Sequence, residues 1–500
     1  MKTISRSLST LTALGCLGLV TSAVQAADIV KNNNLDNLDL GSSWVGGIAP
    51  AATDVAVFGN TYATTGKLNV GAAVQWQGLR VTSPGGAVLI NNSVAGNNIG
   101  IGTGGIDLSG ATADLVIWRY ALNASQTWDV AAGRTFRIGS PDATFYPAAN
   151  NGNVNRVGVF VNNAPGATIT KNGAGVVLLD LGNTTLGDVN WRVNAGVLAN
   201  VWHRENAFGT GTIALAGGGL ASGTPVAGSV GNWTWNNPIV LEAATTSFID
   251  HQNVSGSGRW LKLENPISGS GNLELRNTGV GFDNLNNGFI LAGDNTLSGT
   301  LTILPSSIVR VGGSAPGENN ANAGIFGTLG DATVVNNGWL TFARTDFYET
   351  TNNISGSGAV RIGSESLVGT DGQNVTVHGQ WTYTGNTLIN RGTLALAAGS
   401  SLPNTAEIYL NAPDGETAVL DVSALGSYTL DSGRKLLGRG NTGINQVYGN
   451  FIATSGSQLV PGGSNAVNAL SFVNDLTLSG GGTIQVDIRD GITDSIQVFG

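Results

Sequence analysis

The sequence predicts an all-β solenoid, a fold in which short strands repeat along the chain. Glycine accounts for 75 of the 500 residues, about twice its usual share, while only 11% of residues are charged and 41% are hydrophobic. Disorder requires low hydrophobicity and high charge, so this composition excludes it. Helices are disfavoured because Gly, Asn and Thr fill the gaps between apolar residues. Short alternating segments that resemble one another complete the case for repeated strands.

The N-terminal segment has the layout of a secretory signal peptide. Lys2 and Arg6 precede an apolar stretch at residues 11–20, and small residues follow up to Ala26. This order predicts cleavage after Ala26, so that residues 1–26 are removed on export. A lipoprotein signal ending at Cys16 is the alternative, but the apolar run before that cysteine is short.

The mature chain has few charges and no thiol. Cys16 is the only cysteine, so no disulfide can form after cleavage. Loss of Lys2 and Arg6 moves the formal charge from -9 to -11. A mildly acidic, sparsely charged chain argues against nucleic acid and anionic lipid as partners. No later apolar run approaches the roughly 18 residues of a transmembrane helix, and no motif calls for a cofactor or a metal.

Alternating apolar and polar residues predict the strands. Each alternating segment is bounded by Gly, Asn, Ser or Asp, which predicts strands of about four to six residues with one buried face. The clearest examples are residues 176–179, 273–275, 301–303, 393–396 and 483–488.

Near copies of one motif indicate the solenoid. Residues 254–258, 267–271 and 354–358 read VSGSG, ISGSG and ISGSG, and an apolar alternation follows each. A second element appears at residues 291–303 and 383–394, where Asn and Gly favour left-handed turns between inward-pointing Leu and Ile. Repeats of this kind predict stacked coils instead of a globular core.

Residues 169–198 carry a family resemblance. They contain ITKNGAGVVLL at 169–179, NTTLG at 183–187 and VNAGVL at 193–198. This order resembles the autotransporter-associated β-strand repeat. Residues 267–311 and 383–396 look like partial copies, and residues 43–58 and 126–136 are similar to other modules of such proteins. The resemblance implies a right-handed, single-stranded parallel β-helix, pectin-lyase-like in fold, as found in bacterial passenger segments.

The domain organisation follows from these signals. We expect residues 27–165 to form N-terminal coils, with a cap at Asp28 to Leu40. Residues 166–500 should hold the repeats and continue into further coils beyond Gly500, because residues 494–500 resemble an element that usually leads onward. With roughly 20 to 25 residues per coil and about 4.8 Å between coils, the mature chain predicts about 20 coils and a rod ~100 Å long.

We expect a secreted or cell-surface structural or adhesive segment without catalytic activity, present as a monomeric rod. Extracellular glycans or cell-surface components are the expected partners. The alternative is a glycan-binding or polysaccharide-degrading β-helix enzyme, which would gather acids and bases in one groove. The residues that invite this alternative are Asp250 and His251, with residues 203–205 (His-Arg-Glu) upstream, although solvated loop positions are the simpler explanation.

Two further groups of residues are candidate sites. Asp487, Asp490 and Asp494 are spaced closely enough to hold a cation, but Asp is also favoured at exposed corners. Trp233 and Trp235 should share one strand face, and an outward face would offer a surface for sugar stacking. The alternative is that both indoles pack inside the coil. Three more tryptophans lie nearby in the sequence: Trp191, Trp202 and Trp260.

Overall fold

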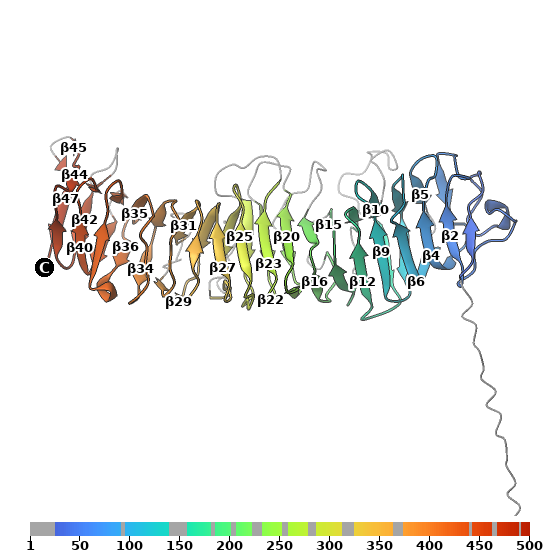
Figure 1. Ribbon diagram of the computed structural model, residues 1–500, viewed down its shortest axis with the longest axis horizontal. Helices are drawn as coiled ribbons and strands as arrows, with labels where there is room; N and C mark the ends of the chain where they lie inside the picture. Colours follow the sequence, from blue (N-terminus) through green and yellow to red (C-terminus); the bar gives the residue numbers. More distant parts are fainter. Residues whose placement is uncertain are drawn as a thin grey trace, which may run out of the picture.

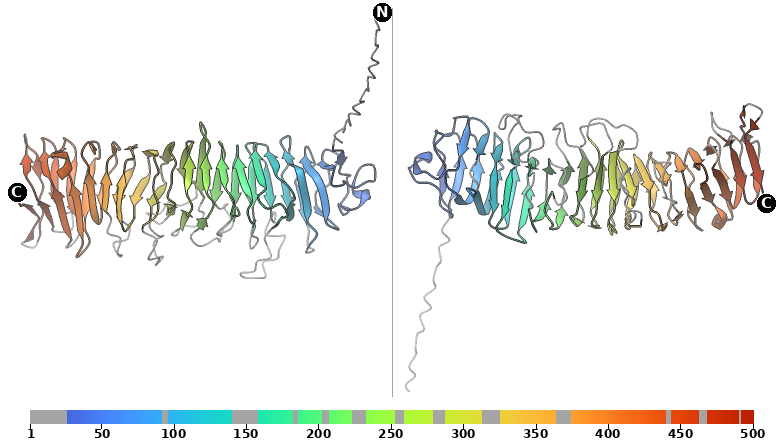
Figure 2. Two further views of the ribbon diagram at one scale, coloured as in Figure 1. Left: turned by 90° about the horizontal axis from the view of Figure 1, so that it is seen from below. Right: turned by 180° about the vertical axis from the view of Figure 1, so that it is seen from behind.

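The computed structural model shows an elongated rod in which short strands lie across the long axis (Figures 1 and 2). It describes residues 26–91, 96–139, 158–181, 186–201, 207–222, 233–252, 259–278, 287–312, 325–363, 374–439, 443–462, 468–489 and 492–500. Of the expected signal peptide, residues 1–25 lie outside these ranges.

Five parallel sheets form the walls of the rod. The first contains β1 (Asp28–Val30), β2 (Val55–Phe58), β4 (Val74–Val81), β6 (Ile99–Leu108), β8 (Arg119–Leu122), β9 (Gln126–Val130), β11 (Val159–Asn162), β12 (Thr168–Asn172), β14 (Asn190–Val193), β16 (Ile213–Leu215), β19 (Ile239–Leu241) and β22 (Ile267–Gly269). The second contains β3 (Lys67–Asn69), β5 (Val88–Asn91), β7 (Leu115–Ile117), β10 (Thr135–Ile138), β13 (Val176–Leu179), β15 (Val197–Asn200), β17 (Gly219–Ser222), β20 (Thr246–His251), β23 (Asn272–Arg276), β25 (Thr300–Ile303), β27 (Thr333–Asn336) and β30 (Ile354–Ser355).

The remaining sheets extend to the C-terminal end. The third contains β18 (Trp233–Trp235), β21 (Arg259–Leu263), β24 (Asn287–Leu291), β26 (Ile308–Val311), β28 (Trp339–Phe342), β31 (Ala359–Ile362), β33 (Thr387–Ile389), β35 (Glu407–Asn411), β38 (Lys435–Arg439), β41 (Gln458–Pro461) and β44 (Thr483–Ile484). The fourth contains β29 (Phe347–Thr350), β32 (Asn374–Val377), β34 (Gly392–Leu396), β36 (Thr417–Asp421), β39 (Ile444–Tyr448), β42 (Ala469–Phe472) and β47 (Ser495–Val498). The fifth contains β37 (Ser427–Leu430), β40 (Asn450–Ala453) and β43 (Leu476–Leu478).

The chain winds through these sheets as a solenoid. It passes from β19 in the first sheet to β20 in the second and β21 in the third, and then repeats the circuit as β22, β23 and β24. Each strand pairs with its counterpart one coil away, so Trp191 pairs with Ile213 and Ile213 with Ile239. Among the strand pairs of the described residues, only β45 (Ile488–Arg489) and β46 (Ile492–Thr493) are antiparallel. The parallel β-helix is therefore confirmed.

Coil length varies more than the sequence predicts. Hydrogen bonds between equivalent positions of adjacent coils show the number of residues in a coil. Asn190 and Thr212 are 22 residues apart in the sequence, and Asn272 and Thr300 are 28 residues apart. Others join residues 33 apart, as at Asn295. The coil length expected from the sequence therefore describes only the shorter coils: the number of residues between paired strands varies, while strand register is kept.

One continuous core fills the rod. Inward side chains of equivalent strands stack on one another, and a ladder in the second sheet illustrates this. Its members are fully buried, and each pairs with the next one in the list: Leu115, Phe136, Val177, Leu198, Leu220, Ile249, Leu275 and Ile303. Burial of such a side chain stabilises by about 1.5–3 kcal/mol, so stability accumulates coil by coil.

The repeated glycines lie where adjacent coils come closest. A Cβ on Gly269 would lie 2.2 Å from the carbonyl oxygen of Leu241, and one on Gly356 would lie 2.2 Å from that of Asn336. Both glycines have positive φ angles, +96° and +105°. The ISGSG copies therefore mark corners where a side chain would clash with the preceding coil. The third copy, at 254–258, lies outside the described residues.

The two ends of the described stack differ. Residues 28–30 of the expected cap form β1, and the N-terminal end is closed by Leu38 and Trp44, which are buried in the core beside the 3-10 helix η1 (Gly41–Ser43). A second 3-10 helix, η3, spans Ser423–Leu425. At the other end apolar side chains are exposed, among them Ile488 and Phe499.

Candidate functional site

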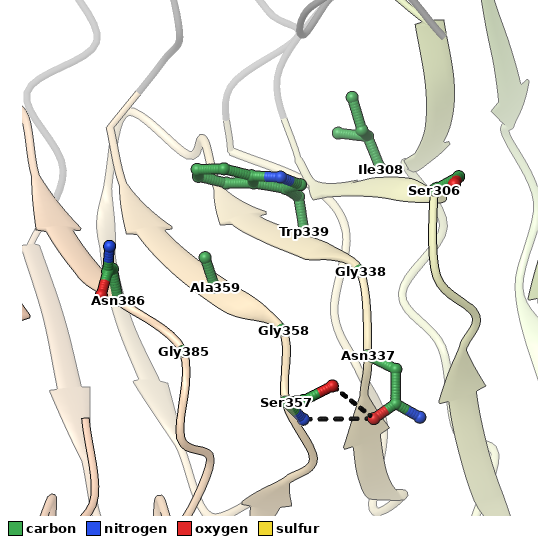
Figure 3. Close-up of a pocket in the computed structure, with 10 residues that line it drawn as sticks. All are labelled: Ser306, Ile308, Asn337, Gly338, Trp339, Ser357, Gly358, Ala359, Gly385 and Asn386. Carbon is green, nitrogen blue, oxygen red and sulfur yellow. Dashed lines mark hydrogen bonds between the residues drawn. The ribbon is translucent and has the colours of Figure 1, made fainter. Parts of the chain in front are cut away.

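A groove lies on the outer surface of the third sheet, where the chain enters β26, β28, β31 and β33. Its volume is about 560 Å³, within the roughly 300–1,000 Å³ typical of small-molecule sites. None of the described residues that line it carries a charge (Figure 3). They are Ser306, Ile308, Asn337, Gly338, Trp339, Ser357, Gly358, Ala359, Gly385 and Asn386.

Four of the lining side chains form a column along the rod. Ile308 pairs with Trp339, and Trp339 pairs with Ala359. Asn386 comes next, because the pairing of β31 with β33 places it beside Ala359. All four project from the same side of the sheet (Figure 3). Parallel strand register thus sets a large aromatic residue beside a small one in the next coil.

Three stacked glycines form one wall of the groove. A Cβ on Gly358 would lie 2.2 Å from the carbonyl oxygen of Gly338, and one on Gly385 would lie 2.2 Å from that of Gly358. The close approach of the coils therefore requires glycine at these positions, independently of any ligand. The groove exists because this corner has no side chains, while Trp339 extends outward beside it.

The indole of Trp339 is held in place by its neighbours. The guanidinium carbon of Arg361 lies 4.7 Å from the ring centroid, a cation–π contact worth about 0.5–2 kcal/mol. The indole also packs against an outer apolar cluster formed by Trp260, Ile290 and Ile308. Trp339 is only half-buried, whereas Arg361 is 2% exposed. The ring is therefore fixed on a rigid sheet while part of it stays accessible at the groove.

Amide and hydroxyl groups line other parts of the groove. The Oδ1 atom of Asn337 accepts hydrogen bonds from the backbone N–H and the hydroxyl of Ser357, at 3.1 and 3.3 Å (Figure 3). This leaves the Asn337 amide nitrogen available as a donor. Ser306 has a φ of +68°, a left-handed conformation that is uncommon for a residue other than glycine. It and Asn386 add a second hydroxyl and a second amide.

Trp233 and Trp235 do share one strand face, but that face is the inner one. Their side chains are 3% and 1% exposed and belong to the core. Trp235 packs edge-on against Phe208, with ring centroids 4.9 Å apart. Of the two alternatives that the sequence left open, the indoles therefore follow packing inside the coil, and they offer no outward sugar-stacking surface. Alternation shows that two residues share a face, but not which face points inward.

The neighbouring tryptophans have different locations. Trp191 is buried in the core, where its indole N–H donates to the carbonyl oxygen of Phe208 at 2.8 Å. Trp260 points outward in the third sheet but is 1% exposed, with the guanidinium of Arg310 5.4 Å from its ring centroid. Trp202 lies outside the described residues. The described indoles of this group therefore form no common exposed surface.

Asp250 and His251 point to opposite sides of β20. His251 is fully buried, and its Nδ1 lies 2.8 Å from the hydroxyl of Ser222 inside the coil. Asp250 is 5% exposed and accepts hydrogen bonds from the backbone N–H and hydroxyl of Thr278, at 3.0 and 2.6 Å. The two side chains do not converge on one groove. Residues 203–205 lie outside the described ranges.

Of the three aspartates considered as a cation site, Asp494 binds the local backbone. Asp494 is 5% exposed and accepts hydrogen bonds from the backbone N–H groups of Asn468 and Asp487, at 3.0 and 2.9 Å. Asp490 lies outside the described residues. Within the described ranges, no group of three or more His, Cys, Asp or Glu side chains is arranged to hold a metal ion. No helix in the same ranges is long and apolar enough to cross a membrane.

The fold and groove define this chain as a parallel β-helical solenoid with an uncharged aromatic groove on its outer face. Comparisons with family models, curated proteins and solved structures give no significant match.

The sequence analysis did not identify Trp339 as a candidate site residue. The signal that would have revealed it is the alignment of the coils: residues 336–339 (NNGW) and 356–359 (GSGA) occupy equivalent corners, so a tryptophan faces an alanine.

Proposed function

We propose that this chain is a secreted or cell-surface structural and adhesive rod without catalytic activity, of the kind to which bacterial passenger segments belong. The observation that carries the proposal is the single continuous core, which runs from Leu38 to Phe472 through stacked coils. A solenoid built in this way gains stability from each added coil, so it can hold a surface far from its point of attachment.

The arrangement of polar side chains supports a role in binding over one in catalysis. The expected acid and base at Asp250 and His251 are buried on opposite sides of one strand and are used in internal hydrogen bonds. Among the residues that the structure describes, none that lines the groove has a titratable side chain. General acid–base chemistry needs such a group within hydrogen-bond reach of the substrate.

The N-terminal segment and the repeats support export. Residues 1–26 have the layout of a signal peptide, and residues 169–198 resemble a repeat of autotransporter passengers. Expression of the full chain with a C-terminal tag tests this. We expect the purified protein to begin at Ala27 and to be found outside the cytoplasm. Retention in the cytoplasm with Met1 intact would contradict it.

A matched variant strengthens the export test. Replacing Leu11 and Leu14 by Lys interrupts the apolar segment of the signal without changing any residue of the rod, so we expect this variant to keep residues 1–26 and to stay inside the cell.

Enzymatic activity is tested separately with acidic and neutral polysaccharides, with and without calcium. Turnover that is lost in Asp250→Asn would overturn the non-catalytic assignment.

A further inference from the structure

We infer that the groove beside Trp339 binds a neutral carbohydrate, with one pyranose ring stacked on the indole. The inference rests on the proposed extracellular role, which places the groove among glycans. A pyranose has an apolar C–H face and a rim of hydroxyl groups. The accessible indole of the groove can stack on the apolar C–H face, and the amides of Asn337 and Asn386 can hydrogen-bond to the hydroxyl groups.

The charge of the groove favours a neutral ligand. The lining residues that the structure describes are all uncharged, and the guanidinium of Arg361 lies over the indole ring and is 2% exposed. An acidic sugar would need a cationic partner at its carboxylate, as anionic ligands generally do. The chain as a whole carries a formal charge of -9, which also disfavours polyanions.

The size of the groove fits a short oligosaccharide. It spans four adjacent strands of the third sheet, and three spacings of about 4.8 Å give a length of roughly 14 Å. Its volume of about 560 Å³ lies in the small-molecule range. A peptide strand added to a sheet edge is a poorer fit, because β28 pairs with β26 on one side and with β31 on the other.

Ala359 determines whether the groove is open. Its methyl group projects beside the indole in the adjacent coil (Figure 3), and a larger side chain there would occupy the space of the sugar. Ala359 is half-buried on the outer face, whereas Gly338, Gly358 and Gly385 form the corner itself. Ala359→Phe is therefore a groove-filling variant that leaves the glycine corner intact.

Titration of the purified mature protein with neutral oligosaccharides tests the inference. The probes are cellotetraose, maltotetraose and chitotetraose, with tetragalacturonate as the acidic comparison, followed by saturation-transfer NMR and calorimetry. We expect at least one neutral probe to bind in the millimolar range, as is typical of a single shallow sugar site. We expect tetragalacturonate not to bind at this groove.

Four variants locate the site. Trp339→Ala and Ala359→Phe should each weaken binding by about 10-fold or more, and Trp339→Phe should retain part of it because a ring remains. Phe347→Ala is the matched control, since Phe347 is an aromatic residue that is 58% exposed but lies outside the groove. Circular dichroism and melting temperature must show that each variant keeps the fold.

Each outcome has a defined meaning. Loss of binding in folded Trp339→Ala and Ala359→Phe, with binding kept in Phe347→Ala, supports the inference. Absence of binding to every neutral probe at tens of millimolar overturns it, as does equal binding by wild type and folded Trp339→Ala, or binding of tetragalacturonate alone. None of these results touches the proposed rod function, whose failure would appear in the export assay.

Discussion

The Nζ atom of Lys171 donates a hydrogen bond of 3.1 Å to the carbonyl oxygen of Ala195, which lies one coil further along the rod. The same ammonium group donates to the carbonyl oxygens of Asn172 and Gly173, at 2.7 and 2.6 Å. Lys171 is fully buried, so these three oxygens replace its water shell. One side chain thus joins a corner to the next coil.

Replacement of Lys171 by Met should lower the stability of this part of the rod. The change removes a charged donor and leaves three carbonyl oxygens without it, a loss of about 2–3 kcal/mol. Thermal unfolding followed by circular dichroism measures the effect. Lys67→Met is the control, because Lys67 is exposed and its replacement should leave the melting temperature nearly unchanged. Equal melting temperatures for the two variants would contradict this account of the corner.

The stability difference between wild type and Lys171→Met should depend on pH. Burial lowers the pKa of Lys171 from 10.5 to about 8, and Asp129 opposes this shift only in part. Between about pH 8 and 10.5 the unfolded chain therefore binds more protons at this residue than the folded one. Its contribution to the free energy of unfolding rises with pH across that window. Melting temperatures of both proteins from pH 7 to 10.5 measure this, and a difference that shrinks as pH rises would be inconsistent with it.

Gly358→Ala should destabilise the rod although it adds only a methyl group. The added Cβ would lie 2.2 Å from the carbonyl oxygen of Gly338, so adjacent coils must separate, at a cost of about 1–3 kcal/mol. Gly110→Ala is the matched control, because its Cβ would have no atom within 4 Å. Denaturant midpoints of the two variants test the prediction. A midpoint for Gly358→Ala within error of Gly110→Ala would show that the coils are not packed as described.

Trp235→Ala should be strongly destabilising, which separates a core indole from an exposed one. The side chain is 1% exposed, and its truncation leaves a cavity that costs about 3–5 kcal/mol. Phe347→Ala removes an aromatic ring that is 58% exposed, so its effect should stay within about 0.5 kcal/mol. Thermal unfolding of both variants makes the comparison, and similar stability would place Trp235 on the outer face instead.

Sequence periodicity predicted the stacked parallel strands well, because glycine-bounded alternation reports strand length and the repeats report coil stacking. It left the facing of Trp233 and Trp235 open, because short strands flanked by turns do not reveal which face is buried. Varying loop lengths hid the register, and so concealed the pairing of Trp339 with Ala359 in the next coil. The signal peptide and the resemblance to autotransporter repeats remain predictions.

Small-angle X-ray scattering of the mature protein tests the central claim, an extended rod, most directly. About 18 to 20 coils at ~4.8 Å give a length of about 90–100 Å and a radius of gyration of roughly 30 Å. A compact globular chain of this size would have a radius of gyration of about 23 Å. The larger radius of gyration, with a rod-like distance distribution, is the predicted result, and the smaller radius of a compact chain would contradict the account.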